Sequence, residues 1–171
     1  MDVGLLVASP QLRDPHFSRT VVLLIQHDAE GALGLIVNRP SSIRLSEVLE
    51  HLPMDDDPPA MWGGPVERAR GFVVFRGEAP EGWQVSDDVA VTGSRERLQE
   101  LARGADPFFL CLGYAGWGPG QLDAEFASGS WIHVDLSPEI LFESPAEERY
   151  DRSLAQLGLS ADRVWMTPGD A

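Results

Sequence analysis

The sequence predicts a single α+β domain, in which a mixed or antiparallel β-sheet carries short helices on its outside. Apolar segments of strand length follow one another with only tight turns between them. Helical periodicity occurs in a few short segments and never alternates regularly with the strands, which argues against a parallel βαβ fold. With 171 residues, 43% of them hydrophobic, the chain is long enough for one buried core and too short for two.

The first strands are predicted close to the N-terminus. Residues 4–9 are an apolar run that stops at Pro10. Residues 20–25 are apolar or β-branched throughout, which is typical of a strand buried on both faces. Residues 32–37 are apolar again after Gly31, so the two segments are expected to form a β-hairpin.

The middle of the chain is expected to mix short helices and short strands. Apolar residues at helical spacing predict an amphipathic helix over residues 45–52, and Ser94 caps a second helix that ends at Gly104. The acidic residues 55–57 between core-like segments are expected to form a solvated loop. The strands expected here are residues 61–66, 71–75, a short segment at Val85, 89–91 and 108–112.

The C-terminal part is expected to be mostly helical around one strand. A helix should begin after Gly120, a strand should cover residues 131–136, and Ser137-Pro138 should start one helical turn. Ser144-Pro145-Ala146-Glu147 matches a capping box and should open a longer helix. The core is expected to span about residues 3–158, and residues 159–171 are expected to be a loosely ordered tail.

Composition excludes several functions. The net charge of −14 disfavours direct binding to DNA, because that binding gains affinity when Lys and Arg neutralise phosphates. All 13 basic residues are arginine, so Schiff-base and Walker-lysine chemistry are excluded. The single cysteine, the absence of a basic leader and the absence of a long apolar run predict a soluble cytoplasmic protein without membrane contact.

The most distinctive segment is Gly113-Tyr114-Ala115-Gly116-Trp117-Gly118-Pro119-Gly120-Gln121-Leu122. It is expected to form a loop that leads into a helix, whose first N–H groups could hold an anion or a carboxylate. Gln121 and Glu125 lie one turn apart on the polar face of that helix, and Trp117 could form a wall beside them. The alternative is a glycine turn that only docks Trp117 in the core.

Other candidates are weaker. Arg39, after Asn38 and before Pro40, is placed for a carboxylate or phosphate, although a structural salt bridge is equally compatible. His27-Asp28 is typical of a hairpin turn, and His133 lacks the further ligands that a metal site requires. Cys111, inside an apolar run, is expected to be a buried hydrophobic residue.

Several short motifs together resemble the YqgE/AlgH family of small bacterial proteins. The matching runs are Leu12-x-Asp14-Pro15-x-Phe17, His27-Asp28-x-x-Gly31-Ala32-x-Gly34, Asn38-Arg39-Pro40, Gly63-Gly64-Pro65-Val66, Gly113–Trp117, Gly120-Gln121-Leu122-x-x-Glu125 and Leu141-Phe142. The resemblance implies an α+β fold with a curved, partly closed sheet flanked by helices. It implies no specific activity. Members are described as transcriptional regulators, without an established DNA-binding site.

Three functions are compatible with these observations. The first is a non-enzymatic binding or regulatory protein that contacts a partner protein or a small anionic ligand and needs no cofactor or metal. Its expected binding residues are Asn38, Arg39, Gly63, Gly64, Gly116, Trp117, Gln121 and Glu125. The second is a hydrolase with Glu125 as general base and the Gly118–Gly120 amides as oxyanion donors. Direct DNA binding is the third.

Overall fold

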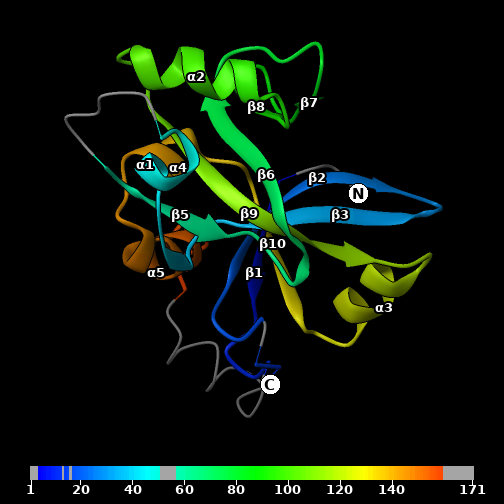
Figure 1. The fold of residues 1–171 in the computed structure, drawn as a ribbon. Helices are drawn as coiled ribbons and strands as arrows, with labels where there is room; N and C mark the ends of the chain where they lie inside the picture. Colours follow the sequence, from blue (N-terminus) through cyan, green and yellow to red (C-terminus); the bar gives the residue numbers. More distant parts are fainter. Residues whose placement is uncertain (1–3, 13, 16, 51–56, 160–171) are drawn as a thin grey trace.

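Ten strands form one open sheet in the computed structural model, which describes residues 4–12, 14–15, 17–50 and 57–159 (Figure 1). The main path through the sheet is β10-β1-β2-β3-β9-β6-β8-β7, and every pairing along this path is antiparallel. The two remaining strands, β4 and β5, lie beside it. The expected α+β class with a mixed, mainly antiparallel sheet is confirmed.

The N-terminal strands make the most buried part of the sheet. β1 (Gly4–Ala8) pairs on one edge with β2 (Val21–Asp28) and on the other with β10 (Trp131–Val134). β2 continues through a tight turn into β3 (Gly31–Ile36), as the hairpin prediction required. Every residue of β1 and the first five residues of β2 are buried, so these strands are covered on both faces.

β9 (Phe108–Trp117) is the central strand, and it joins two halves of the sheet. One edge pairs with β6 (Val66–Arg76). The other edge pairs with β3 near the end of β9 and, in parallel, with β5 (Pro59–Trp62) in its middle. In Figure 1, β6 and β9 run side by side through the middle of the molecule.

The remaining strands lie at the margins. β4 (Pro40–Arg44) pairs with β5, and β8 (Val89–Thr92) lies between β6 and the two-residue β7 (Trp83–Gln84). The curvature of the sheet brings β7 close to β2, where the Trp83 indole donates a hydrogen bond to the side chain of Gln26, with 3.4 Å between Nε1 and Oε1. This hydrogen bond links β7 to β2 without a strand pairing between them in the described residues, so the sheet stays open.

The helices are short and lie outside the sheet (Figure 1). They are α1 (Leu45–Val48), α2 (Arg95–Arg103), α3 (Gln121–Ala127), α4 (Pro138–Phe142) and α5 (Arg149–Ala155), with a 3-10 turn over Ala146–Glu148. Ser94 caps α2 as predicted, because its Oγ accepts from the amide of Arg97 at 3.1 Å. None of the helices in the described ranges is long and apolar enough to cross a membrane.

Two hydrophobic clusters lie on the two faces of the sheet. The larger is formed by β1, β2 and β3 with the C-terminal helices, and the smaller lies under α1 and α2. Arg149 of α5 anchors the first cluster, since its buried guanidinium donates to the carbonyls of Val37 and Ser144. Burial lowers the pKa of Arg149, but a guanidinium remains cationic at neutral pH.

Several local predictions were wrong. Residues 113–117, expected as a loop, are the second half of β9. Residues 67–70, expected between two strands, belong to β6, and β4 was not predicted. The Ser144 hydroxyl accepts from Arg152 at 3.0 Å, and Pro145 occupies the cap position of the 3-10 turn without a side-chain cap bond.

Other predictions fall partly outside the described residues. The helix expected over residues 45–52 ends at Val48, and residues 51–52 of that prediction, like residues 55–56 of the expected acidic loop, lie outside the described residues. Asp57, the described member of the acidic triplet, accepts from both the amide and the hydroxyl of Ser46, at 2.8 and 2.7 Å. These bonds hold the pKa of Asp57 below its usual range. The expected tail lies outside the described residues from residue 160 onward.

Candidate functional site

The connection between β5 and β6 is held unusually close to β9 by two glycines. The Gly63 amide donates to the Leu112 carbonyl and its own carbonyl accepts from Ile36, both at 2.7 Å. A Cβ on Gly63 would lie 2.3 Å from the carbonyl oxygen of Gly113, and one on Gly64 would lie 2.1 Å from the carbonyl carbon of Tyr114. No other residue type fits at these two positions without moving the backbone.

A small cavity of about 100 Å³ lies beside this close approach, and two arginines line it. We call it the arginine cavity. Its lining consists of Ile36, Arg39, Trp62, Gly64, Pro65 and Arg68. Arg68 reaches the cavity from an irregular part of β6, where the pairing with β9 shifts between Val66 and Gly71. The cavity therefore brings together residues from the end of β3, the end of β5 and the start of β6.

The electrostatics of this cavity favour an anion. The Arg39 guanidinium donates to the carbonyl of Ser18 at 3.2 Å, which fixes one side of the group. Partial burial lowers the pKa of Arg39, but a guanidinium remains charged at neutral pH. The Arg68 guanidinium carbon lies 5.7 Å from the centre of the Trp62 ring, and no carboxylate of the described residues forms an ion pair with it.

Asn38, predicted beside Arg39 as a binding residue, uses its side chain inside the fold. Its Oδ1 accepts from the amide of Val21 at 2.8 Å, and its Nδ2 donates to the carbonyl of Arg19 at 3.0 Å. These bonds tie the start of β2 to the chain that follows β3. Asn38 therefore positions its neighbour Arg39, and its own amide is engaged on both sides.

Polar groups of the distinctive segment Gly113–Leu122 and of its neighbours converge on the carboxylate of Glu125. Its Oε1 accepts from the indoles of Trp117 and Trp131, at 3.0 and 2.8 Å, and its Oε2 accepts from the Gln121 amide at 2.9 Å. Gln121 in turn accepts from the amide of Gly118 at 3.0 Å. The polar groups proposed as a catalytic set thus bond to one another.

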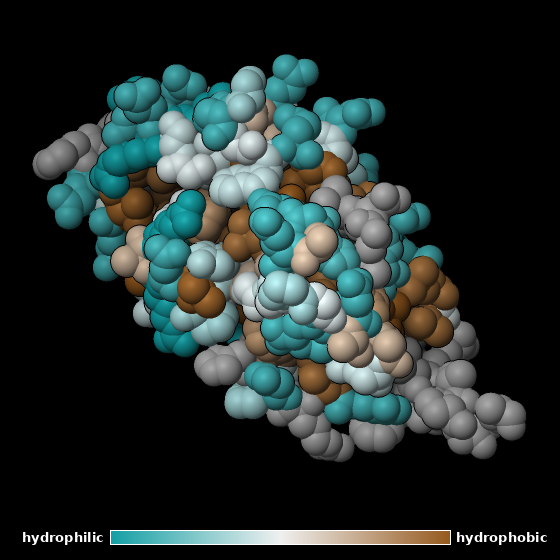
Figure 2. Space-filling model, turned by 90° about the vertical axis from the view of Figure 1, so that its right-hand side faces the viewer, coloured by the Kyte–Doolittle hydropathy of each residue, from teal (hydrophilic) through white to brown (hydrophobic). Residues whose placement is uncertain are grey.

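Aromatic rings surround this carboxylate. Trp117 and Trp131 are 6% and 4% exposed, their ring centres lie 6.0 Å apart, and Phe17 packs against both. Figure 2, which faces the side carrying α3, shows mainly hydrophilic residues with separate hydrophobic patches between them. The cluster of Glu125, Trp117, Trp131 and Gln121, which we call the Glu125 cluster, therefore joins β9, α3 and β10 to one another. Its bonding pattern argues against the hydrolase hypothesis.

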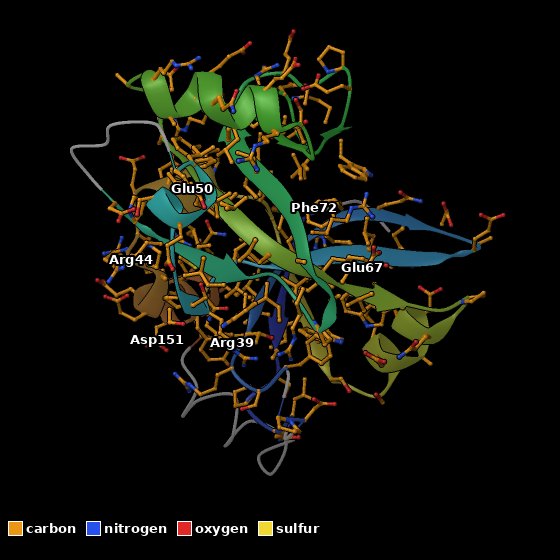
Figure 3. All side chains as sticks on the ribbon, in the orientation of Figure 1. Arg39, Arg44, Glu50, Glu67, Phe72 and Asp151 are labelled. Atoms are coloured by element: carbon orange, nitrogen blue, oxygen red, sulfur yellow. The ribbon has the colours of Figure 1, made fainter. Side chains whose placement is uncertain are left out.

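The predicted binding residues consequently fall into two groups rather than one pocket. Arg39 and Gly64 line the arginine cavity, with Asn38 and Gly63 holding its walls. Trp117, Gln121 and Glu125 belong to the Glu125 cluster, and Gly116 on β9 pairs with Leu33 beside it. Figure 3 marks Arg39 near the lower middle of the molecule, well separated from α3 at its right side.

Trp62 and Arg68 were not predicted as site residues. Their local signal is weak, because a tryptophan and an arginine near a glycine pair are common on protein surfaces. The glycine pair itself was a usable signal, since double glycine in a strand region indicates close backbone approach. Residues on either side of such a contact can then face a common space.

The remaining candidates have structural surroundings. His27 lies 3.4 Å from Asp123 of α3, between Nε2 and Oδ1, and Asp28 caps the hairpin turn by accepting from the Glu30 amide at 2.8 Å. Burial raises the pKa of the Cys111 thiol to about 12, so this cysteine is protonated at neutral pH. Among the described residues, no group of three His, Cys, Asp or Glu side chains is placed to hold a metal ion.

The fold places this chain among small α+β proteins with an open, mainly antiparallel sheet. The AlgH-like family matches residues 5–162, and the chain belongs to this family. A UPF0301 protein of Coxiella burnetii is 39% identical over 167 residues, which cover 93% of this chain and 90% of the relative. One of Burkholderia cenocepacia is 41% identical over 180 residues, covering 97% and 93%.

Solved structures agree with this assignment. The AlgH protein from Pseudomonas aeruginosa matches with a TM-score of 0.75 and 38% identity, over 92% of this chain and 89% of that one. Protein DIP2367 from Corynebacterium diphtheriae matches with a TM-score of 0.78 over 91% and 87%, but at 18% identity it shows the fold alone. The resemblance expected from the sequence motifs is confirmed, and none of these names states an activity.

Proposed function

We propose that this protein is a non-enzymatic binding protein, and that it holds an anionic group in the cavity between Arg39 and Arg68. One observation carries the proposal: two arginines line a cavity of about 100 Å³ in a chain whose net charge is −14. A planar guanidinium with several donors suits a carboxylate or phosphate, and a partly desolvated site strengthens that attraction. Trp62 adds a rigid apolar wall beside the anion.

The hydrolase alternative has less support. A general base must accept a proton from a bound substrate or water, and Glu125 accepts hydrogen bonds from three side chains on both of its oxygens. The Gly118 amide, which the hydrolase would use as an oxyanion donor, bonds to the Gln121 side chain. The arginine cavity offers charge and space without a nucleophile or base among its lining residues, which favours binding over catalysis.

We propose further that any regulatory effect on transcription is indirect and operates in the cytoplasm. The net charge of −14 opposes association with a phosphate backbone, so a change in ligand state or a partner protein would transmit the effect. The one cysteine is unpaired and buried, which suits a reducing compartment.

A titration followed by nuclear magnetic resonance tests the binding proposal. Sodium acetate and sodium phosphate are added while the Gly64 amide and the Trp62 indole are observed. We expect saturable shifts in the natural protein and their loss in Arg68→Met and Arg39→Met. Arg103→Met, which removes one exposed charge at the end of α2, serves as the control.

The controls separate binding from damage to the fold. Because Arg39 also donates to the Ser18 carbonyl, circular dichroism must show that Arg39→Met is folded. Shifts that do not saturate, or that persist unchanged in both cavity variants, would show that the cavity does not bind anions.

A further inference from the structure

A second hollow lies beside the irregular part of β6, and most of its lining is apolar. It measures about 280 Å³ and lies between α2 and the β6–β9 pair. Its aliphatic lining residues are Val48, Ala69, Val73, Leu98, Leu110 and Leu112. Arg95 closes one end by donating to the Val48 carbonyl at 2.8 Å. We call this hollow the apolar groove.

The apolar groove and the arginine cavity have no lining residue in common, but residues that line the one lie next to residues that line the other. Arg68 lines the cavity, and its neighbour Ala69 lines the groove. Across the sheet, Trp62 lines the cavity and is paired in register with Leu112, which lines the groove. The two spaces are therefore adjacent at two independent places, once through consecutive residues of β6 and once through the β5–β9 pairing.

We propose that the two spaces form one site for an anionic amphiphile, a carboxylate with an unbranched aliphatic chain such as a medium-chain fatty acid. The carboxylate lies between Arg39 and Arg68, and the chain lies in the apolar groove. This rests on the proposed function, because the head group uses the same arginines. The charge complementarity is local, since Arg39 and Arg68 meet the carboxylate, while the lining of the groove is mostly aliphatic side chains and glycine, with Ser94 and Arg95 as its polar residues.

An aliphatic chain fits the groove better than the apolar end of a peptide. The strands that form the floor are paired to each other, with Gly71 opposite Leu112 and Val73 opposite Leu110. Where the two strands are paired, they use their backbone groups on each other, so a peptide lying over that part would bury amide groups without partners. That burial costs free energy, whereas a methylene chain has no polar groups to satisfy.

Chain length gives the first test. Isothermal titration calorimetry measures acetate, hexanoate, octanoate and decanoate, all below their micelle concentrations. Each buried methylene should tighten binding about fourfold until the groove is filled. Decanol tests the head group and should bind at least about tenfold more weakly than decanoate, the low end for losing a charge-assisted bond.

Two variants then separate head from tail. Arg68→Met should weaken decanoate and acetate alike. Ala69→Trp fills the groove and should weaken the affinity for decanoate by at least about tenfold, which corresponds to the loss of about two buried methylenes. The affinity for acetate should not change. The matched controls are Arg103→Met and Ala105→Trp, both at exposed positions away from either space, and neither should change the affinity.

The outcomes distinguish this proposal from the one it rests on. If acetate binds and chain length has no effect, the amphiphile proposal is wrong and the anion site stands. If neither acetate nor decanoate binds, both are wrong. If decanol binds as tightly as decanoate, or a peptide ending in leucine binds more tightly with the same response to Ala69→Trp, the fatty-acid assignment is overturned.

Discussion

Replacing Glu125 should destabilise the protein, because its carboxylate holds two buried indoles. In Glu125→Leu the Nε1–H groups of Trp117 and Trp131 lose their acceptor. A buried donor left without a partner costs about 1–3 kcal/mol. Because Glu125 is only half-buried, water can reach part of this space, and we expect a loss of about 2–4 kcal/mol for the two donors together.

Glu125→Gln should cost less. The variant keeps an acceptor oxygen for the indoles and loses the negative charge, and charge-assisted hydrogen bonds are about twice as strong as neutral ones. We expect a loss of about 1 kcal/mol, and the Gln121 amide must turn to avoid facing a second donor. The ordering of the two variants is therefore part of the prediction.

Urea unfolding followed by circular dichroism measures both values, provided that the denaturant slope is the same for all variants. Glu100→Leu is the matched control, because Glu100 is exposed on α2. A Glu125→Leu variant as stable as this control would refute the structural role. If Glu125→Gln were as unstable as Glu125→Leu, the negative charge rather than the acceptor would be the stabilising feature.

Five further predictions concern the core and the net charge. Arg149→Met should lower the free energy of unfolding in urea by about 2–3 kcal/mol, because two buried carbonyls lose their donor, whereas the exposed Arg103→Met should not. Gly63→Ala should lower the free energy of unfolding by about 2–3 kcal/mol, because the new Cβ would meet backbone atoms. Gly129→Ala should cost less, because Gly129 has a φ of +81° but open space around its Cβ position, and equal losses would contradict this prediction. Cys111 should resist a thiol reagent in the folded protein and react after unfolding; rapid reaction of the folded protein would show that the thiol is accessible. Burial raises the pKa of Cys111 from 9.0 to about 12, so its contribution to stability is present below pH 9.0 and falls as the pH rises towards about 12. At pH 10 the loss should be about 1.4 kcal/mol, and Cys111→Ala should remove this part of the pH dependence. A gel-shift titration at low salt should show no retardation of duplex DNA at micromolar protein, and clear retardation would refute the argument from a net charge of −14.

Periodicity and turn residues were enough to predict most of the strands and helices. The buried hairpin of β2 and β3 and the capped helix α2 have strong local signals, and both formed as expected. β4 has no such signal, since it begins with Pro40 and continues with two serines. Its pairing comes from β5, so only the tertiary structure makes it a strand.

Local sequence was misleading where glycines allow contact between distant strands. Gly113 has a φ of +79°, and its Cβ position lies 2.5 Å from the carbonyl oxygen of Gly64. Gly113 was expected in a loop, and the Gly63-Gly64 pair indicated a close approach without showing its partner. In the structure these glycines let β5, β6 and β9 pack backbone against backbone, and the partner strand cannot be inferred from the spacing of one segment.

The candidate site was predictable only in part for a related reason. Arg39 and Gly64 were expected in a binding site, but the cavity is also lined by Trp62 at the end of β5 and by Arg68 in the irregular part of β6. Glu125 was expected in a binding or catalytic site because it lies one helical turn from Gln121 on a polar face. Its actual role depends on Trp131 from the following strand, which no local pattern connects to it.

The position of β1 between β2 and β10 has a consequence for synthesis on the ribosome. Its C-terminal residue Ala8 pairs with Trp131 and accepts a hydrogen bond from Tyr150, 142 residues further along. At translation rates of about 5–20 residues per second, that partner emerges on the order of ten seconds later. Until then the outer edge of an entirely apolar strand stays open to other chains, so the nascent protein should depend on chaperones more than its modest size suggests.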